Sequence, residues 1–198
     1  MQSIKVKIRF TEEALGTQSA NPDIHREFIA SKSPNAETIE DEVAAIGVDA
    51  AIEKSMTVFP KIADGTPFIY DYQIRGFFKE ACGALKKVPG TKSSKIKAHK
   101  KQVDNLIFVE PRQILIDLKG GMMDVCQRPL RASTPQGERI SLASSESIPE
   151  GSEIEFTVKC FIDEDTELVK EWLDYGVFKG ISQWRNSGKG RFTYEIID

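Results

Sequence analysis

Two hydrophobic periods alternate along this chain, and their order limits the available folds more than any other feature. Near the start, apolar residues alternate with basic ones, the period-two pattern of a half-buried strand: Ile4, Val6, Ile8 and Phe10. Over residues 71–85, apolar side chains instead recur every three or four residues, which predicts one amphipathic helix. A chain that combines both periods predicts an α+β fold.

The same two patterns continue to the end of the chain. Strand character returns at 104–110, 112–118, 122–130, 138–142, 154–160 and 192–196. A second helix is predicted from Asp163 onward, because carboxylates stabilise a helix N-terminus, and Trp172 falls on its apolar face. With insertions set aside the order is βαββαβ, which predicts a ferredoxin-like or RRM-like core with extra β-hairpins.

A chain of 198 residues is long enough for one elaborated domain, so we expect a single domain over 1–198. Two segments differ from the rest: a helical insertion at 18–55, whose second helix is acidic, and a basic flexible loop at 86–102. The loop holds seven lysines, one histidine and no acid, a composition that cannot bury itself. In a protein of net charge −3, it is either a solubilising loop or a contact for a polyanion.

Composition excludes several classes of protein. No apolar run approaches the length of a membrane span, and the first residues lack the apolar centre of a signal peptide, so we expect no membrane contact. Cys82, Cys126 and Cys160 form no CxxC pair and favour buried free thiols in a reducing compartment, hence a cytoplasmic protein. The sequence has no nucleotide-binding fingerprint and no acidic cluster at metal-ligand spacing, so we expect no cofactor and no metal.

The segment 180–192, here called the terminal loop, is rich in glycine and basic residues. Glycine allows positive φ and close backbone approach, exposed amides bind anions, and Arg and Lys add positive charge. Trp184 is expected either to stack on a base or to anchor the loop on the core. A tight turn that needs glycine for its dihedral angles is the open alternative, because glycine-rich motifs are weak signals alone.

Four segments, in order, resemble the repeat-associated mysterious protein (RAMP) superfamily of CRISPR-associated proteins. They are the first strand with 14–17, the stretch 64–79, the entry into a strand at 147–156, and the last helix with the terminal loop. Together they cover about half of the chain. The resemblance implies binding of single-stranded nucleic acid and association with like subunits or with effector-complex subunits, and it does not by itself imply cleavage.

The sequence also departs from the family pattern. Residues 70–72 read Tyr-Asp-Tyr where the family has a Pro-Gly-Ser turn, and Ser182 stands where a glycine is expected. The acidic part of the 18–55 insertion has no obvious counterpart in the family. These differences indicate a distant relative, one carried by a phage or another mobile element.

The sequence therefore predicts a non-catalytic protein that binds single-stranded RNA or DNA. Basic residues of the first strand, the first helix, the 86–102 segment and the terminal loop would follow the phosphates, while aromatic rings stack on bases. The predicted contact residues are Lys5, Lys7, Arg9, Arg75, Lys79, Lys86, Lys87, Lys92, Lys95, Lys97, Lys100, Lys101, Trp184, Arg185, Gly188, Lys189, Gly190 and Arg191.

Two alternatives remain open. In the first, the chain is a protein-interaction module that docks on or inhibits a CRISPR-type effector complex, with the acidic insertion as the partner surface. The other alternative is a metal-independent endoribonuclease with His99 as the base, because neighbouring lysines lower the pKa of an imidazole. A single histidine in a flexible loop is poorly positioned for catalysis, and no other catalytic residue stands out.

Overall fold

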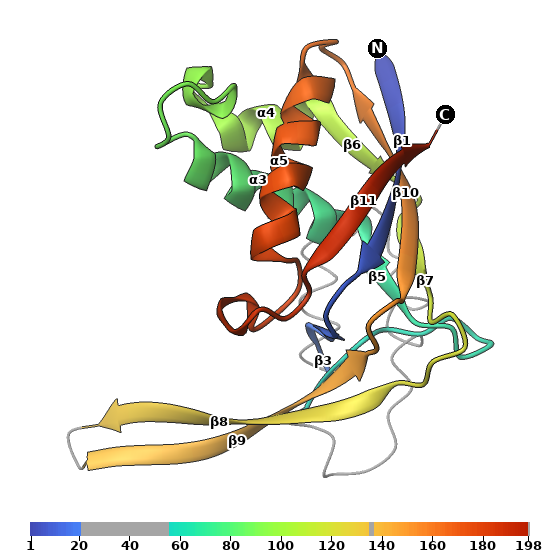
Figure 1. Ribbon diagram of the computed structural model, residues 1–198, viewed down its shortest axis with the longest axis vertical. Helices are drawn as coiled ribbons and strands as arrows, with labels where there is room; N and C mark the ends of the chain where they lie inside the picture. Colours follow the sequence, from blue (N-terminus) through green and yellow to red (C-terminus); the bar gives the residue numbers. More distant parts are fainter. Residues whose placement is uncertain (21–55, 135–136, 198) are drawn as a thin grey trace.

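The computed structural model describes residues 1–20, 56–134 and 137–197, and over these residues the chain has an α+β fold with two β-sheets (Figure 1). The larger sheet has the strand order β11–β1–β10–β7–β5, and β6 also pairs with β10. Its strands are β1 (Gln2–Phe10), β5 (Phe68–Tyr70), β6 (Ile107–Glu110), β7 (Gln113–Asp117), β10 (Glu153–Cys160) and β11 (Phe192–Ile197).

The first strand lies inside this sheet and has one apolar and one basic face, as its sequence predicts. It pairs antiparallel with β10 and with β11, so that Val6 lies opposite Phe156 on one side and Ile196 on the other. Val6 and Ile8 are fully buried, whereas the basic residues between them point to the opposite face. The period-two prediction for this strand is therefore confirmed.

Two long helices cover the apolar face of the larger sheet (Figure 1). They are α3 (Asp71–Leu85) and α5 (Asp165–Lys179), and both were predicted. The Phe78 and Trp172 rings from the two helices pack against each other, with centroids 5.5 Å apart, inside the core. Tyr70 is the N-cap of α3, and Asp71 is its first helical residue, as the predicted range 71–85 has it.

The basic segment 86–102 differs from the flexible loop that its composition predicts. It contains the 3-10 turn η2 (Ser93–Lys95), and α4 (His99–Leu106) begins within it. The predicted strand at 104–110 is therefore helical over its first residues and becomes β6 only at Ile107. The segment is folded because α5 supplies partners that its own composition does not reveal, and Ser93 is fully buried.

The smaller sheet is built around a long hairpin. In it, β8 (Asp124–Thr134) and β9 (Gly137–Ile148) pair over eleven residue pairs, and the ribbon extends away from the rest of the structure (Figure 1). Short strands complete this sheet: β2 (Ala14–Leu15), β3 (Gln18–Ser19) and β4 (Thr57–Val58). Apart from β3, the predicted 18–55 insertion and its helices lie outside the described residues or at their edge.

Candidate nucleic-acid interface

Glycines shape the terminal loop where it crosses its own chain. Gly180 and Gly190 have φ of +78° and +71°. The Ile181 N–H donates to the Gly190 carbonyl oxygen at 3.0 Å, and the Gly190 N–H donates to the Glu13 carbonyl oxygen at 2.8 Å. A Cβ atom at Gly190 would lie 2.0 Å from the Ile181 oxygen. These two glycines therefore serve the fold, which is the turn interpretation that the sequence left open.

Gly188 differs from these two glycines. Its φ of +85° also favours glycine, but a Cβ atom there would meet nothing closer than the Arg191 side chain at 3.6 Å. The Trp184 ring, four residues earlier, is 38% exposed. The tip of the terminal loop is thus open to solvent, whereas its base is packed between other segments.

An aromatic ring and a buried cation meet at the tip of the loop. The Arg128 guanidinium carbon lies 5.2 Å from the centroid of the Trp184 ring, a cation–π geometry. Arg128, from β8, is only 8% exposed and donates to Gln183 Oε1 at 2.9 Å. No carboxylate pairs with Arg128 in the part of the chain that the structure describes. Its positive charge is therefore held by neutral groups and one aromatic ring.

The residues before Trp184 fix its position. The Gln183 side-chain amide donates to Thr57 Oγ1 at 2.8 Å and to the Gly16 carbonyl oxygen, and the Ser182 hydroxyl donates to the Leu15 carbonyl oxygen. Ser182 and Trp184 both have positive φ, +77° and +53°. Such conformations cost free energy in residues other than glycine and cluster at binding and catalytic sites. The loop is held in an unfavourable conformation that presents the Trp184 ring.

Some basic side chains around the terminal loop pair with a carboxylate, and others contact only neutral oxygen atoms. Arg185 lies 2.7 Å from a Glu80 carboxylate oxygen, and Lys189 pairs with Glu13. Lys179 instead donates to Asn186 Oδ1 at 2.8 Å, and Arg191 donates to the Phe178 carbonyl oxygen at 3.0 Å. Beside them is an open pocket of about 340 Å³, lined by Glu80, Lys179, Ser182, Gln183, Trp184, Arg185 and Asn186.

The basic face of β1 is largely neutralised by carboxylates of the neighbouring strand β10. Lys7 lies 2.9 Å and Arg9 3.9 Å from carboxylate oxygens of Glu153 on β10. Lys119 bonds the same Glu153 at 2.8 Å and Asp117 at 2.7 Å. The hydrogen bonds from Lys119 lower the pKa of both Glu153 and Asp117, so these carboxylates stay charged at neutral pH.

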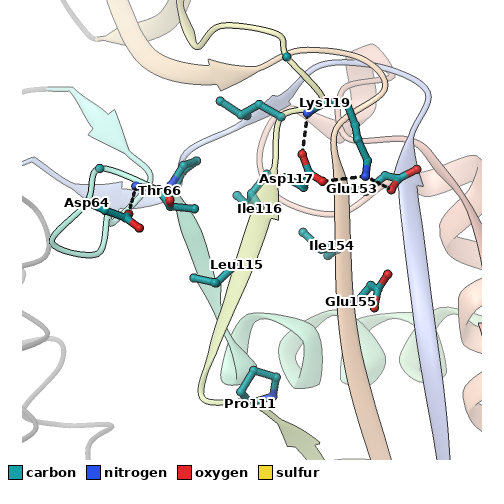
Figure 2. A pocket seen from close by; sticks show the side chains of 14 residues that line it. Asp64, Thr66, Pro111, Leu115, Ile116, Asp117, Lys119, Glu153, Ile154 and Glu155 are labelled. Atoms are coloured by element: carbon teal, nitrogen blue, oxygen red, sulfur yellow. Dashed lines mark hydrogen bonds and ion pairs between the residues drawn. The ribbon is translucent and has the colours of Figure 1, made fainter.

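This charged network borders an open cleft of about 810 Å³ on the sheet face away from the helices (Figure 2). Leu115 and Pro111 form part of its apolar wall. Lys5, further along β1, pairs with Glu155 at 3.1 Å. Nucleic-acid binding by Lys5, Lys7 and Arg9 stays a prediction, and their pairing makes this face less basic than β1 alone indicates.

Some basic side chains on α3 and in the segment after it pair with a carboxylate, and others do not. Arg75 pairs with Asp71 at 2.9 Å and Lys79 with Asp104 at 2.5 Å. Lys92 pairs with Glu167 at 2.8 Å, and Lys86 donates to the Lys97 carbonyl oxygen at 2.7 Å. Five exposed lysines have no ion pair with a described residue: Lys87, Lys95, Lys97, Lys100 and Lys101. The predicted contact residues lie on four parts of the structure: β1, α3, the 86–102 segment and the terminal loop.

The remaining candidates from the sequence have plain structural settings. His99 is the first residue of α4, and burial, followed by Lys86 and Lys100, lowers its pKa. Cys82 and Cys160 are buried and Cys126 is half-buried, all as free thiols. Over 1–20, 56–134 and 137–197, no group of three or more acidic, histidine or cysteine side chains is placed to hold a metal ion. Among the same residues, no helix is long and apolar enough to cross a membrane.

Arg128 and Gln183 belong to the candidate site and were not predicted from the sequence. Arg128 lies in a predicted strand with ordinary composition, and its contacts with Trp184 and Gln183 join segments far apart in the chain. No local pattern announces such a contact. The sequence signal was the high density of glycine and basic residues in the terminal loop, which led to the prediction of Trp184 but not of Arg128.

Comparison with known proteins adds evidence on the fold. No protein-family model and no curated protein sequence matches the chain. Among solved structures, a chain of the type III-B Cmr-β complex bound to cognate target RNA superposes with a TM-score of 0.58 at 10% identity, covering 99% of this chain and 60% of that one. This chain thus spans about 60% of the length of that subunit.

Two further structures match over most of both chains. A chain of a type IV-B CRISPR complex has a TM-score of 0.51 at 10% identity, covering 99% of this chain and 90% of that one. Cmr6 from Pyrococcus furiosus has a TM-score of 0.51 at 9% identity, covering 98% of each chain. The sequence resemblance to RAMP proteins is supported to this extent: the chain has the fold of proteins found in CRISPR complexes.

Proposed function

We propose that this protein binds single-stranded nucleic acid, as a non-catalytic subunit of a CRISPR-type assembly. The observation that supports the proposal most is the half-exposed Trp184 ring, held over the buried Arg128 guanidinium at the junction of the hairpin and the terminal loop. The fold shared with proteins of CRISPR complexes, one of them bound to target RNA, supports the same function.

The chemistry of this site suits an unpaired base. An aromatic ring offers a stacking surface that accepts any base, and such a contact is worth about 1–3 kcal/mol per base. Bases in a duplex are already stacked on both faces, so only a single strand offers a free face to Trp184. Arg128, Lys179 and Arg191 add positive charge that no described carboxylate cancels, and this charge attracts phosphates.

The finer features of the fold belong to the same proposal. We infer that the core is ferredoxin-like. The strands lie in the order β11, β1, β10, followed by β6 and β7, which both pair with β10, and α3 and α5 cover one face of this sheet (Figure 1). We also infer a single domain and a cytoplasmic protein that assembles with copies of itself or with effector-complex subunits. An origin in a phage or mobile element stays a prediction from the sequence departures alone.

A substitution of Trp184 tests the proposed function. Trp184→Ala is expected to weaken binding of a single-stranded oligonucleotide about tenfold, which corresponds to about 1.4 kcal/mol, while duplex binding stays within twofold. Phe108→Ala is the matched control, because this ring is also 38% exposed but lies on β6, away from the terminal loop.

The outcomes separate the candidate functions. Unchanged single-strand affinity in Trp184→Ala would refute the stacking site. If the wild-type protein binds no oligonucleotide at low salt, the protein-interaction module becomes the better account. Cleavage of RNA in the presence of a chelator, lost in His99→Ala, would instead support the endoribonuclease.

A further inference from the structure

We propose that the lysine segment (residues 86–102) is a folded surface that binds the phosphodiester backbone of nucleic acid, without distinguishing single strands from duplexes, at a site separate from Trp184. The inference rests on the proposed function, because it assigns a second contact surface to the same class of ligand. Four features of the segment support it: unpaired charge, an internal anchor, the lack of Phe, Tyr and Trp, and its separation from the terminal loop along α5.

The charge of this surface is not cancelled within the described structure. Its five lysines without an ion pair are all exposed: Lys87, Lys95, Lys97, Lys100 and Lys101. Most other cations in the described chain contact a carboxylate, including Lys79 and Lys92 close by. The protein as a whole has a net charge of −3, so an uncompensated basic cluster creates a strong local field. Phosphates are the ligands that such a field attracts.

A carboxylate from α5 anchors the segment. Glu171 accepts hydrogen bonds from the Lys92 N–H at 2.7 Å, the Ser93 N–H at 3.0 Å and the Ser93 hydroxyl at 2.5 Å. The Trp172 indole N–H in turn donates to Ser93 Oγ at 2.9 Å, and both groups are buried. The turn that bears Lys95 is therefore fastened to the core, so the backbone that carries this lysine is already ordered and less entropy is lost on binding.

The segment also lacks the large aromatic side chains on which bases stack best. Residues 86–102 contain no Phe, Tyr or Trp, and their one aromatic ring, the His99 imidazole, is partly buried. The first turn of α4 carries Lys100 and no acid, and its N-cap Ala98 provides no side-chain hydrogen bond. The positive end of the helix thus adds to the charge of the lysines instead of being offset. Contacts of this kind reach phosphates in single strands and duplexes alike.

The helix α5 separates this surface from the terminal loop. Its first turns contact the lysine segment through Glu167 and Glu171, and its last residue, Lys179, precedes the loop. Lys179 follows Glu171 by eight residues, which span about 12 Å along the helix axis, so the two surfaces lie at different positions along α5 (Figure 1). Asp174 lies on α5 between Glu171 and Lys179, and its negative charge repels a phosphate backbone that would follow the helix. One bound strand long enough to reach both would gain affinity from their linkage.

A triple substitution tests this assignment. Lys95→Ala, Lys97→Ala and Lys100→Ala are combined, and the matched control combines Lys61→Ala, Lys119→Ala and Lys159→Ala, whose lysines pair with carboxylates that do not contact the lysine segment. Both variants change the net charge equally. Affinities for a single-stranded oligonucleotide and for its duplex are measured by fluorescence anisotropy over a series of salt concentrations, after circular dichroism confirms that both variants are folded.

The expected result is an equal loss for both ligands. We expect affinity to fall at least tenfold for single strand and duplex alike, and the slope of log K against log salt to fall by about 2 for single strands, because each lost phosphate contact removes about 0.7. The control variant is expected to keep the wild-type slope. An unchanged slope in the test variant, or a loss confined to single strands, would overturn the inference.

The test also separates this inference from the proposed function. If Trp184→Ala abolishes the single-strand preference while the lysine variant behaves as expected, both assignments hold. If the lysine variant behaves as expected but Trp184→Ala changes nothing, the phosphate surface stands and the stacking site is refuted. A wild-type protein that binds neither ligand at low salt refutes both.

Discussion

Gly190→Ala is expected to destabilise the fold because the terminal loop uses this glycine to cross its own chain. The substitution places a Cβ atom 2.0 Å from the Ile181 carbonyl oxygen at a residue with φ of +71°. The left-handed conformation costs about 1–2 kcal/mol in alanine. Relief of the contact also disrupts the hydrogen bonds that Gly190 makes with Ile181 and Glu13, each worth about 0.5–1.5 kcal/mol.

These contributions sum to about 3 kcal/mol, which lowers the melting temperature of a domain of this size by about 6–12 °C. Gly188→Ala is the matched control, since its φ of +85° is equally unfavourable but no atom lies within 3.6 Å of the added Cβ. The control is expected to lose only about 1–2 kcal/mol. Chemical denaturation of both variants measures the difference, and equal stabilities would refute the steric explanation.

Two further predictions follow from buried groups. Burial raises the pKa of Cys160 to about 11 and also raises the pKa of Cys82. Iodoacetamide at pH 8 is therefore expected to label Cys126 alone in the folded protein. Rapid labelling of all three cysteines would contradict this prediction. Glu171→Gln places an amide N–H₂ opposite N–H donors of the lysine segment, and we expect a loss of about 1–3 kcal/mol in the free energy of unfolding, against no measurable loss for the exposed Glu155→Gln.

The sequence predicted most strands of the larger sheet and its two long helices, because each has a local hydrophobic period, but it did not predict the short strand β5 or the helix α4. Val6 and Ile8 alternate with lysines, and the apolar residues of α3 recur with helical spacing. The pattern within each element therefore predicts which of its faces is buried. The hairpin strands β8 and β9 were also expected, although they are longer than predicted. Such features depend on neighbours in sequence, which a pattern can show.

The sequence could not predict features that depend on distant partners. The lysine segment has too few apolar residues to fold by itself. It is ordered by hydrogen bonds with Glu171 and Trp172, which belong to a helix much later in the chain. The basic face of β1 is matched by Glu153 and Glu155, which the sheet register brings opposite it. Arg128 likewise meets Trp184 only through the fold.

The central claim is a preference for single-stranded nucleic acid, and a titration of the wild-type protein tests it most directly. A labelled single strand and its duplex, each as RNA and as DNA, are titrated at two salt concentrations with anisotropy as the signal. The account predicts tighter binding of the single strand at both salt concentrations, with affinity that falls as salt rises. Equal affinity for single strand and duplex at both concentrations would contradict it.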